Sequence, residues 1–155
     1  MKHLPTKFLL TIVVDEQKND MAAAIQTYKK VLADYPYFAP ALKRLAILIA
    51  ENMENDPQAN DYATKARAAY PEDPAVAKAI GIIVYRQGDY SKAERLLNES
   101  LDAINTDPEI FYYLGMAQYH LKKTLECKKN LQKALSLNLS AQFSQEAKKV
   151  LAELK

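Results

Sequence analysis

Apolar residues recur along most of the chain at intervals that fit the ~3.6-residue turn of an amphipathic α-helix. The periodic segments are short, and prolines or polar turns separate them. No segment shows the alternation of a β-strand, so the pattern predicts an all-α fold. The expected helices are residues 5–17, 20–34, 39–53, 57–69, 74–87, 90–104, 108–121, 124–137 and 141–154.

An internal repeat organises these helices. Pro74 and Pro108 each stand where a helix is expected to begin, and they lie 34 residues apart. The same step places Gly81 on Gly115, and a step of 35 relates the second repeat to the third. A fixed period of this length indicates a stack of helix-turn-helix units. The expected repeats are about 5–38, 39–73, 74–107 and 108–140, followed by a closing helix at about 141–154.

Small residues recur at the same places in each repeat, where two helices must approach closely. On the first helices and then the second helices, they are Ala46, Gly81, Gly115, Ala24, Ala59, Ala93 and Cys127.

At these positions the chain resembles the tetratricopeptide repeat, a family pattern of large apolar residue, leucine-glycine, aromatic, alanine, aromatic, alanine and proline. The third and fourth repeats supply Ile80-Gly81, Tyr85, Ala93, Leu97 and Ser100, and Phe111, Leu114-Gly115, Tyr119, Cys127, Leu131 and Ala134. The first repeat departs from the pattern, because Thr11-Ile12 replaces leucine-glycine. The resemblance implies one domain over residues 1–155, a right-handed superhelical solenoid with a C-terminal capping helix.

A narrower resemblance concerns the C-terminal repeats of long bacterial tetratricopeptide proteins, some of which accompany exopolysaccharide and envelope export systems. Its residues are Phe38-Ala39-Pro40-Ala41-Leu42 and the closing Phe143, Glu146-Ala147 and Val150-Leu151.

The family resemblance also implies a binding site, because the first helix of each pair lines a concave groove. Carried over by position, the groove residues are Val13, Lys43, Ile47, Lys78, Ile82, Tyr85, Arg86, Tyr112, Met116 and Tyr119. An apolar ladder with aromatic and cationic edges suits a helical or extended peptide. Two interpretations stay open for the tyrosines and the ladder: they contact a partner, or they pack between neighbouring repeats.

The expected first helix has almost no polar face. Phe8, Leu10 and Val14 belong to an apolar run whose burial needs more than one neighbouring surface. Either the chain is part of a longer array, or this helix contacts a second copy.

The leading functional hypothesis, which rests on the groove residues, is a non-catalytic protein-interaction scaffold. The alternative is an assembly module, which forms a homodimer or continues an array, of a bacterial envelope or polysaccharide export system.

No motif indicates catalysis, a metal or a cofactor. His3 and His120 have no motif around them, and Cys127 falls where the repeat requires a small buried residue. The acidic turn over residues 52–56 lacks the spaced ligands and turn glycine of a calcium loop. We therefore expect no enzyme, although the chain could serve as an accessory arm of one.

Net charge and hydropathy limit the classes of partner that the chain is expected to bind. The net charge of +2 over 155 residues argues against nucleic acid, and the longest apolar run is shorter than a membrane span of ~20 residues. Lysines 122, 123, 128, 129 and 133 form a basic group in the last repeat. A solvated face is the simpler interpretation, and a site for an acidic partner or a membrane surface is the alternative. The compartment stays open: cytoplasmic by default, or periplasmic for a piece of an exported parent.

Overall fold

The computed structural model describes residues 20–52 and 55–155. The helix expected over residues 5–17 lies outside the described residues. Within them the structure contains eight helices and no strand, which confirms the all-α prediction. The helices are α2 (Met21–Asp34), α3 (Ala39–Glu51), α4 (Ala59–Ala69), α5 (Pro74–Arg86), α6 (Tyr90–Leu101), α7 (Pro108–His120), α8 (Thr124–Ser136) and α9 (Ala141–Glu153).

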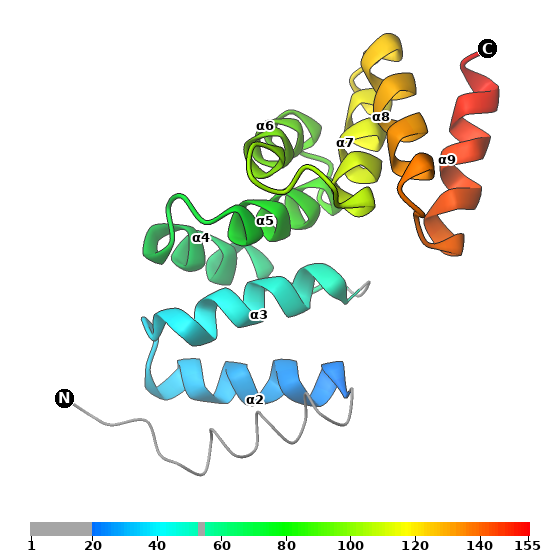
Figure 1. Cartoon of the computed structure of the whole chain (residues 1–155). Helices are drawn as coiled ribbons and strands as arrows, with labels where there is room; N and C mark the ends of the chain where they lie inside the picture. The colour runs from blue at the N-terminus through cyan, green and yellow to red at the C-terminus, as the bar shows by residue number, and fades with distance from the viewer. Residues whose placement is uncertain (1–19, 53–54) are drawn as a thin grey trace. The chain divides into compact units, whose positions relative to one another are not determined.

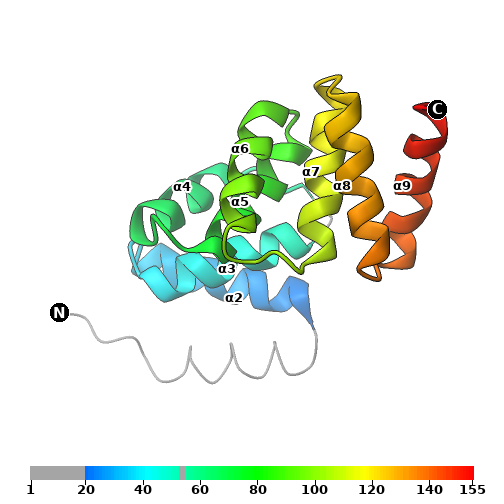
Figure 2. The ribbon, with the colours of Figure 1, turned by 45° about the horizontal axis from the view of Figure 1, so that its top comes forward.

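The chain divides into two compact units, Met1–Pro71 and Glu72–Lys155. In the first unit α2 packs against α3, and α3 packs against α4 (Figure 1). Its core holds side chains such as Leu42 and Leu45, which are fully buried. In the second unit α5 pairs with α6 and α7 pairs with α8, and α9 lies beside α8 (Figure 2). The first helices of successive pairs also meet, because α7 contacts both α5 and α9.

Aspartate and proline set the helix starts in the second unit. Asp73 and Asp107 each accept hydrogen bonds from backbone N–H groups of the first helical turn, and Pro74 and Pro108 occupy its first position. Proline suits this position because the first turn has no use for its missing N–H. This is why the starts of α5 and α7 coincide with the predicted ones.

Two glycines let the paired helices touch. A Cβ on Gly81 would lie 2.9 Å from Cγ of Leu97, and one on Gly115 would lie 2.7 Å from Cδ2 of Leu131. Such distances are below van der Waals contact, so the small residue at this repeat position is a packing requirement. Cys127, which faces the same kind of contact from α8, is fully buried.

The closing helix caps the second unit. Ala147 and Val150 of α9 are buried against the stack, whereas Lys148 and Lys149 are exposed. At the repeat step, these two lysines stand where Leu114 and Gly115 contact a second helix. A solvated face at this point is what a terminal element of a repeat array requires.

Candidate protein-binding site

The first helices of the second unit are joined by polar contacts that follow the repeat step. The hydroxyl of Tyr112 on α7 donates to Oε2 of Glu146 on α9 at 2.6 Å. The hydroxyl of Tyr119 donates to Oε2 of Glu153 at 2.9 Å. Phe143 stacks on the ring of Tyr112, with 4.6 Å between ring centroids. The closing helix therefore engages both groove tyrosines of α7.

Three of the predicted groove residues of the second unit are buried. Ile82, Tyr112 and Met116 are 1%, 3% and 3% exposed, so they belong to the core of the repeats. Burial and the hydrogen bond to Glu146 raise the pKa of Tyr112 above its ordinary value. These side chains position their neighbours and are not accessible to a partner in this structure.

Lys78 on α5 is half-buried and paired. Its Nζ lies 2.8 Å from Asp107 and 3.6 Å from Glu109 on the adjacent first helix. Burial alone would lower the pKa of Lys78, but the hydrogen bond to Asp107 and the charges of both carboxylates raise it above the ordinary value. The pair links α5 to the start of α7, so Lys78 is engaged within the protein.

Aromatic side chains remain accessible toward the C-terminal ends of α5 and α7. The imidazole of His120 is exposed and stacks on Tyr90 at 4.1 Å, with 5° between the ring planes. Tyr85 makes an edge contact with Tyr90 at 5.6 Å and lies 6.2 Å from His120. Tyr85, Tyr90 and Tyr119 are half-buried. We call Tyr85, Arg86, Tyr90, Tyr119 and His120 the aromatic edge.

The buried side chain of Tyr113 supports the aromatic edge. The ring of Tyr113 contacts Tyr85 at 5.3 Å, and Tyr113 also shares a hydrogen bond with the half-buried Arg86. Burial raises the pKa of Tyr85 above its ordinary value, and the carboxylate of Glu146 adds to this effect. The tyrosine therefore stays neutral over the physiological range and presents an uncharged ring.

A pocket adjoins the aromatic edge. It has a volume of about 490 Å³ and lies where the end of α7, the turn into α8 and the end of α9 meet. Its lining residues are Tyr119, His120, Lys122, Thr124 and Leu154. The lining combines an aromatic ring, an aliphatic side chain and a lysine.

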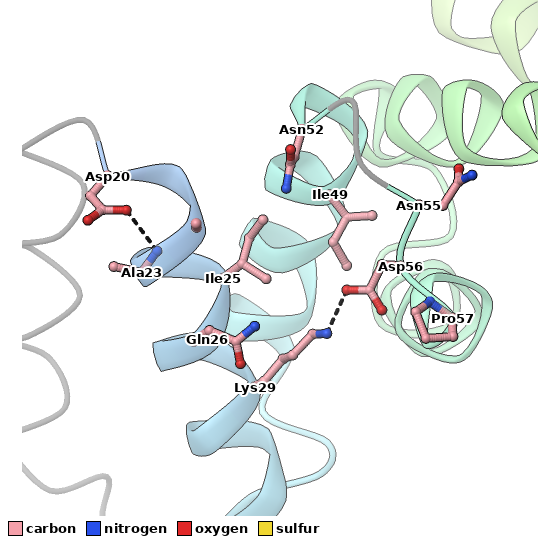
Figure 3. Close-up of a pocket in the computed structure, with 11 residues that line it drawn as sticks. Asp20, Ala23, Ile25, Gln26, Lys29, Ile49, Asn52, Asn55, Asp56 and Pro57 are labelled. Carbon is pink, nitrogen blue, oxygen red and sulfur yellow. Dashed lines mark hydrogen bonds and ion pairs between the residues drawn. The ribbon is translucent and has the colours of Figure 1, made fainter.

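The first unit holds two of the predicted groove residues. On α3, Nζ of Lys43 lies 5.3 Å from the ring centroid of Tyr70, and Ile47 is half-buried. A separate pocket of about 500 Å³ lies between α2, α3 and the turn before α4 (Figure 3). Across it, Lys29 pairs with Asp56 at 2.6 Å, and both side chains are largely buried. This pair connects α2 to the turn before α4, so its role is structural.

Four predicted residues cannot be placed. Val13 of the groove and the oligomer contacts Phe8, Leu10 and Val14 lie outside the described residues. In the part that the structure describes, no group of His, Cys, Asp and Glu side chains could hold a metal ion. No described helix is long and apolar enough to cross a membrane.

Similarity to known proteins supports the interpretation of the repeats. No protein-family model matches the chain. A TPR repeat-containing protein of Pseudomonas aeruginosa is 34% identical over 100 residues, which span 64% of this chain and 17% of that protein. This chain thus corresponds to a small part of that relative's length.

Solved structures show the same fold. MamA from Desulfovibrio magneticus RS-1 superposes with a TM-score of 0.71 at 15% identity, over 96% of this chain and 92% of that one. PilF of Pseudomonas aeruginosa has a TM-score of 0.68 at 25% identity, over 96% of this chain and 66% of that one. The chain has the fold of tetratricopeptide-repeat proteins. Tetratricopeptide-repeat proteins generally serve as non-catalytic scaffolds for protein interaction.

The repeat pattern predicts the groove positions but not the partners of their tyrosines. Glu146 and Glu153 of the closing helix stand 34 residues after Tyr112 and Tyr119, the same step that aligned the repeats. Extending the repeat register into α9 would have found them. The stacking of Tyr90 on His120 had no signal in the pattern, because it joins the start of a second helix to the end of the next first helix.

Proposed function

We propose that this tetratricopeptide-repeat protein is a non-catalytic interaction module that binds a segment of a partner protein at the aromatic edge. The observation that supports it is the set of accessible rings around His120, next to a pocket of about 490 Å³. Tyrosine and arginine are enriched among the residues that contribute most to protein–protein binding. Tyrosine offers a large contact area and loses little conformational freedom when it binds.

The side chains of the aromatic edge and its pocket indicate which partner segment would bind. A side chain of the size of leucine or phenylalanine fits the pocket beside Tyr119 and Leu154. Lys122 at the rim favours a carboxylate near that side chain. Because the rings already contact each other, the surface is largely preformed and little ordering opposes binding. The expected ligand is a short segment with an apolar anchor and an acidic neighbour.

Selection from a displayed library of random short peptides tests this function. We expect the chain to enrich peptides with an apolar anchor, and the double variant Tyr119→Ala with His120→Ala to bind them at least about tenfold more weakly. The matched control is Tyr37→Ala, because Tyr37 is 80% exposed in the first unit and far from the pocket lining along the chain. Circular dichroism establishes that each variant remains helical. Enrichment of no peptide, or equal binding by the double variant, would contradict the proposal.

The alternative, an assembly module, is motivated by the apolar run over residues 8–14. Burial of this run against a second copy would give a dimer that Leu10→Glu or Val14→Glu dissociates. Sedimentation analysis over a range of concentrations distinguishes the two hypotheses, since a monomer at all concentrations contradicts the assembly module. The predicted roles of Val13, Lys43 and Ile47 in a groove stay predictions.

A further inference from the structure

The charge of the chain is unevenly distributed. The last 35 residues contain eight lysines and three glutamates, whereas the whole chain has a net charge of only +2. The preceding part therefore carries a net negative charge. Within the last 35 residues, α8 has three lysines and one glutamate, whereas the two lysines of α9 are balanced by two glutamates. A surface of one sign attracts a partner of the opposite sign.

Four of these lysines have no internal partner. Lys128, Lys129 and Lys133 of α8 and Lys148 of α9 make no ion pair with any described residue. Some lysines elsewhere in the described part pair with carboxylates, as Lys78 does with Asp107, whereas Lys30 and Lys92 do not.

The carboxylates of α9 are already engaged. Glu146 and Glu153 accept hydrogen bonds from the tyrosines of α7. On α8, the one acidic residue is Glu126, which makes no ion pair with Lys128, Lys129 or Lys133. The Nζ of Lys123 pairs with Glu94 at 2.7 Å, and the hydrogen bond and charge of Glu94 raise the pKa of this lysine.

Lys148 lies on the helix that packs beside α8. Glu146 faces α7, and a residue two positions later points about 200° away around the helix axis. Lys148 is therefore on the flank of α9 opposite the contact with Tyr112, and it is exposed. On α8, Lys129 and Lys133 are exposed and Lys128 is half-buried. We call these four lysines and Leu125 the lysine face.

Leu125 distinguishes this surface from a simple solvated face. Its side chain is 80% exposed on α8, one turn before Lys128 and Lys129. In the described part, only Tyr37 is an equally exposed large apolar side chain, and Tyr37 contacts Lys65. A large exposed leucine among unpaired cations matches a partner that combines acidic and apolar side chains.

We propose that the lysine face binds an acidic segment of a partner protein, with Leu125 receiving an apolar side chain of that segment. These five residues differ from those of the aromatic edge and of its pocket lining. A lipid surface is disfavoured because membrane-surface helices present a broad apolar face, and here one leucine is exposed. Nucleic acid is disfavoured because the face has neither arginine nor an aromatic side chain for base stacking.

Fluorescence anisotropy with a defined probe tests the proposal on the full chain. The probe is a labelled amphipathic peptide of glutamate with a leucine stripe, and the control peptide has glutamine in place of glutamate. We expect the wild type to prefer the glutamate peptide. The triple variant Lys128→Glu, Lys129→Glu and Lys148→Glu should bind it at least about tenfold more weakly, and Leu125→Ala about threefold more weakly.

The matched control carries the same change in net charge at exposed positions elsewhere, Lys30→Glu, Lys92→Glu and Arg95→Glu. It should change the affinity by less than about twofold, and the double variant of the aromatic edge should bind the probe as the wild type does. Equal weakening by both triple variants would overturn the proposal, because net charge alone would then explain binding. No binding of the glutamate peptide, or no effect of Leu125→Ala, would also overturn it. Tighter binding of phosphatidylserine vesicles or of a single-stranded oligonucleotide would overturn it as well, by assigning the face to another class of partner.

Discussion

At the scale of single residues, Gly81 and Gly115 determine how closely the paired helices of the second unit approach. Both glycines face a leucine of the following helix at a distance that leaves no room for a methyl group. The two sites differ in one respect. Around Gly115 the nearest atoms include the backbone N of Leu131 at 3.2 Å, whereas around Gly81 all three are side-chain atoms. A side chain can shift more easily than backbone can.

We therefore predict that Gly115→Ala destabilises the protein by about 1–3 kcal/mol, and that Gly81→Ala costs less. Urea unfolding followed by circular dichroism measures both. Gly88→Ala is the control for backbone conformation, because Gly88 has a φ of +84° and no atom lies within 4 Å of the position that an added methyl group would take. Its expected cost of about 1 kcal/mol comes from the left-handed backbone alone. A larger loss for Gly81→Ala than for Gly115→Ala would contradict the packing argument.

Buried and half-buried tyrosines make the stability of the protein depend on pH in the alkaline range. Burial raises the pKa of Tyr85, Tyr112 and Tyr113 above the ordinary value of a tyrosine. An unfolded chain ionises its tyrosines near pH 10, whereas these remain protonated in the folded state at that pH. The unfolded state then binds fewer protons, so the stabilising contribution is complete below about pH 10 and is lost as the pH rises above it.

We predict that the free energy of unfolding falls steeply between about pH 10 and pH 11, and that Tyr112→Phe makes this decrease shallower. The matched control is Tyr37→Phe, which changes an exposed tyrosine. Urea titrations at several pH values provide the measurement. An identical pH dependence for the wild type and Tyr112→Phe would show that this tyrosine does not contribute.

At the scale of helices, Asp107 links two elements. One carboxylate oxygen accepts a hydrogen bond from the backbone N–H of Glu109 at the start of α7, and the other pairs with Lys78 of α5 at 2.8 Å. Helix capping and the contact between the first helices of two repeats thus depend on the same side chain. Cap and ion pair can be separated, because asparagine retains the capping oxygen and lacks the charge.

We predict that Asp107→Asn destabilises the protein less than Asp107→Ala, whose cap loss costs about 1 kcal/mol in addition. Added salt should reduce the difference between wild type and Asp107→Asn, because screening weakens the ion pair. Thermal unfolding at low and high ionic strength measures both effects. Equal destabilisation by the two substitutions would exclude the cap as a separate contribution.

The elements were predictable from sequence because their signals are local. Helical periodicity, Pro74, Pro108 and the aspartates before them determine where α5 and α7 begin. The site was less predictable, because a position in the repeat does not say whether a side chain is covered. Ile82 and Met116 occupy the expected groove positions and are nevertheless buried. Their exposure depends on the packing of neighbouring helices, which one sequence does not reveal.

At the scale of the whole molecule, the second unit contains the aromatic edge, its pocket and the lysine face. Two helix pairs and the capping helix α9 form its core, and its ion pair between Lys78 and Asp107 lies within it. Repeat proteins gain stability from contacts between neighbouring units, so a fragment with intact internal contacts retains much of it.

We predict that residues 72–155 alone form a helical fragment that unfolds cooperatively and binds the library-selected peptide within about threefold of the affinity of the full chain. Circular dichroism with urea and fluorescence anisotropy provide the two measurements. A fragment that folds but does not bind would place part of the site in the first unit.

The central claim, that the aromatic edge binds a partner segment, is tested most directly by nuclear magnetic resonance. The library-selected peptide is titrated into the isotope-labelled chain, and the shifts of backbone amide signals are assigned to residues. Binding at the aromatic edge should give the largest shifts at Tyr85, Arg86, Tyr119, His120 and Lys122. Shifts confined to α2, α3 and α4, or to the outer side of α6, would contradict it.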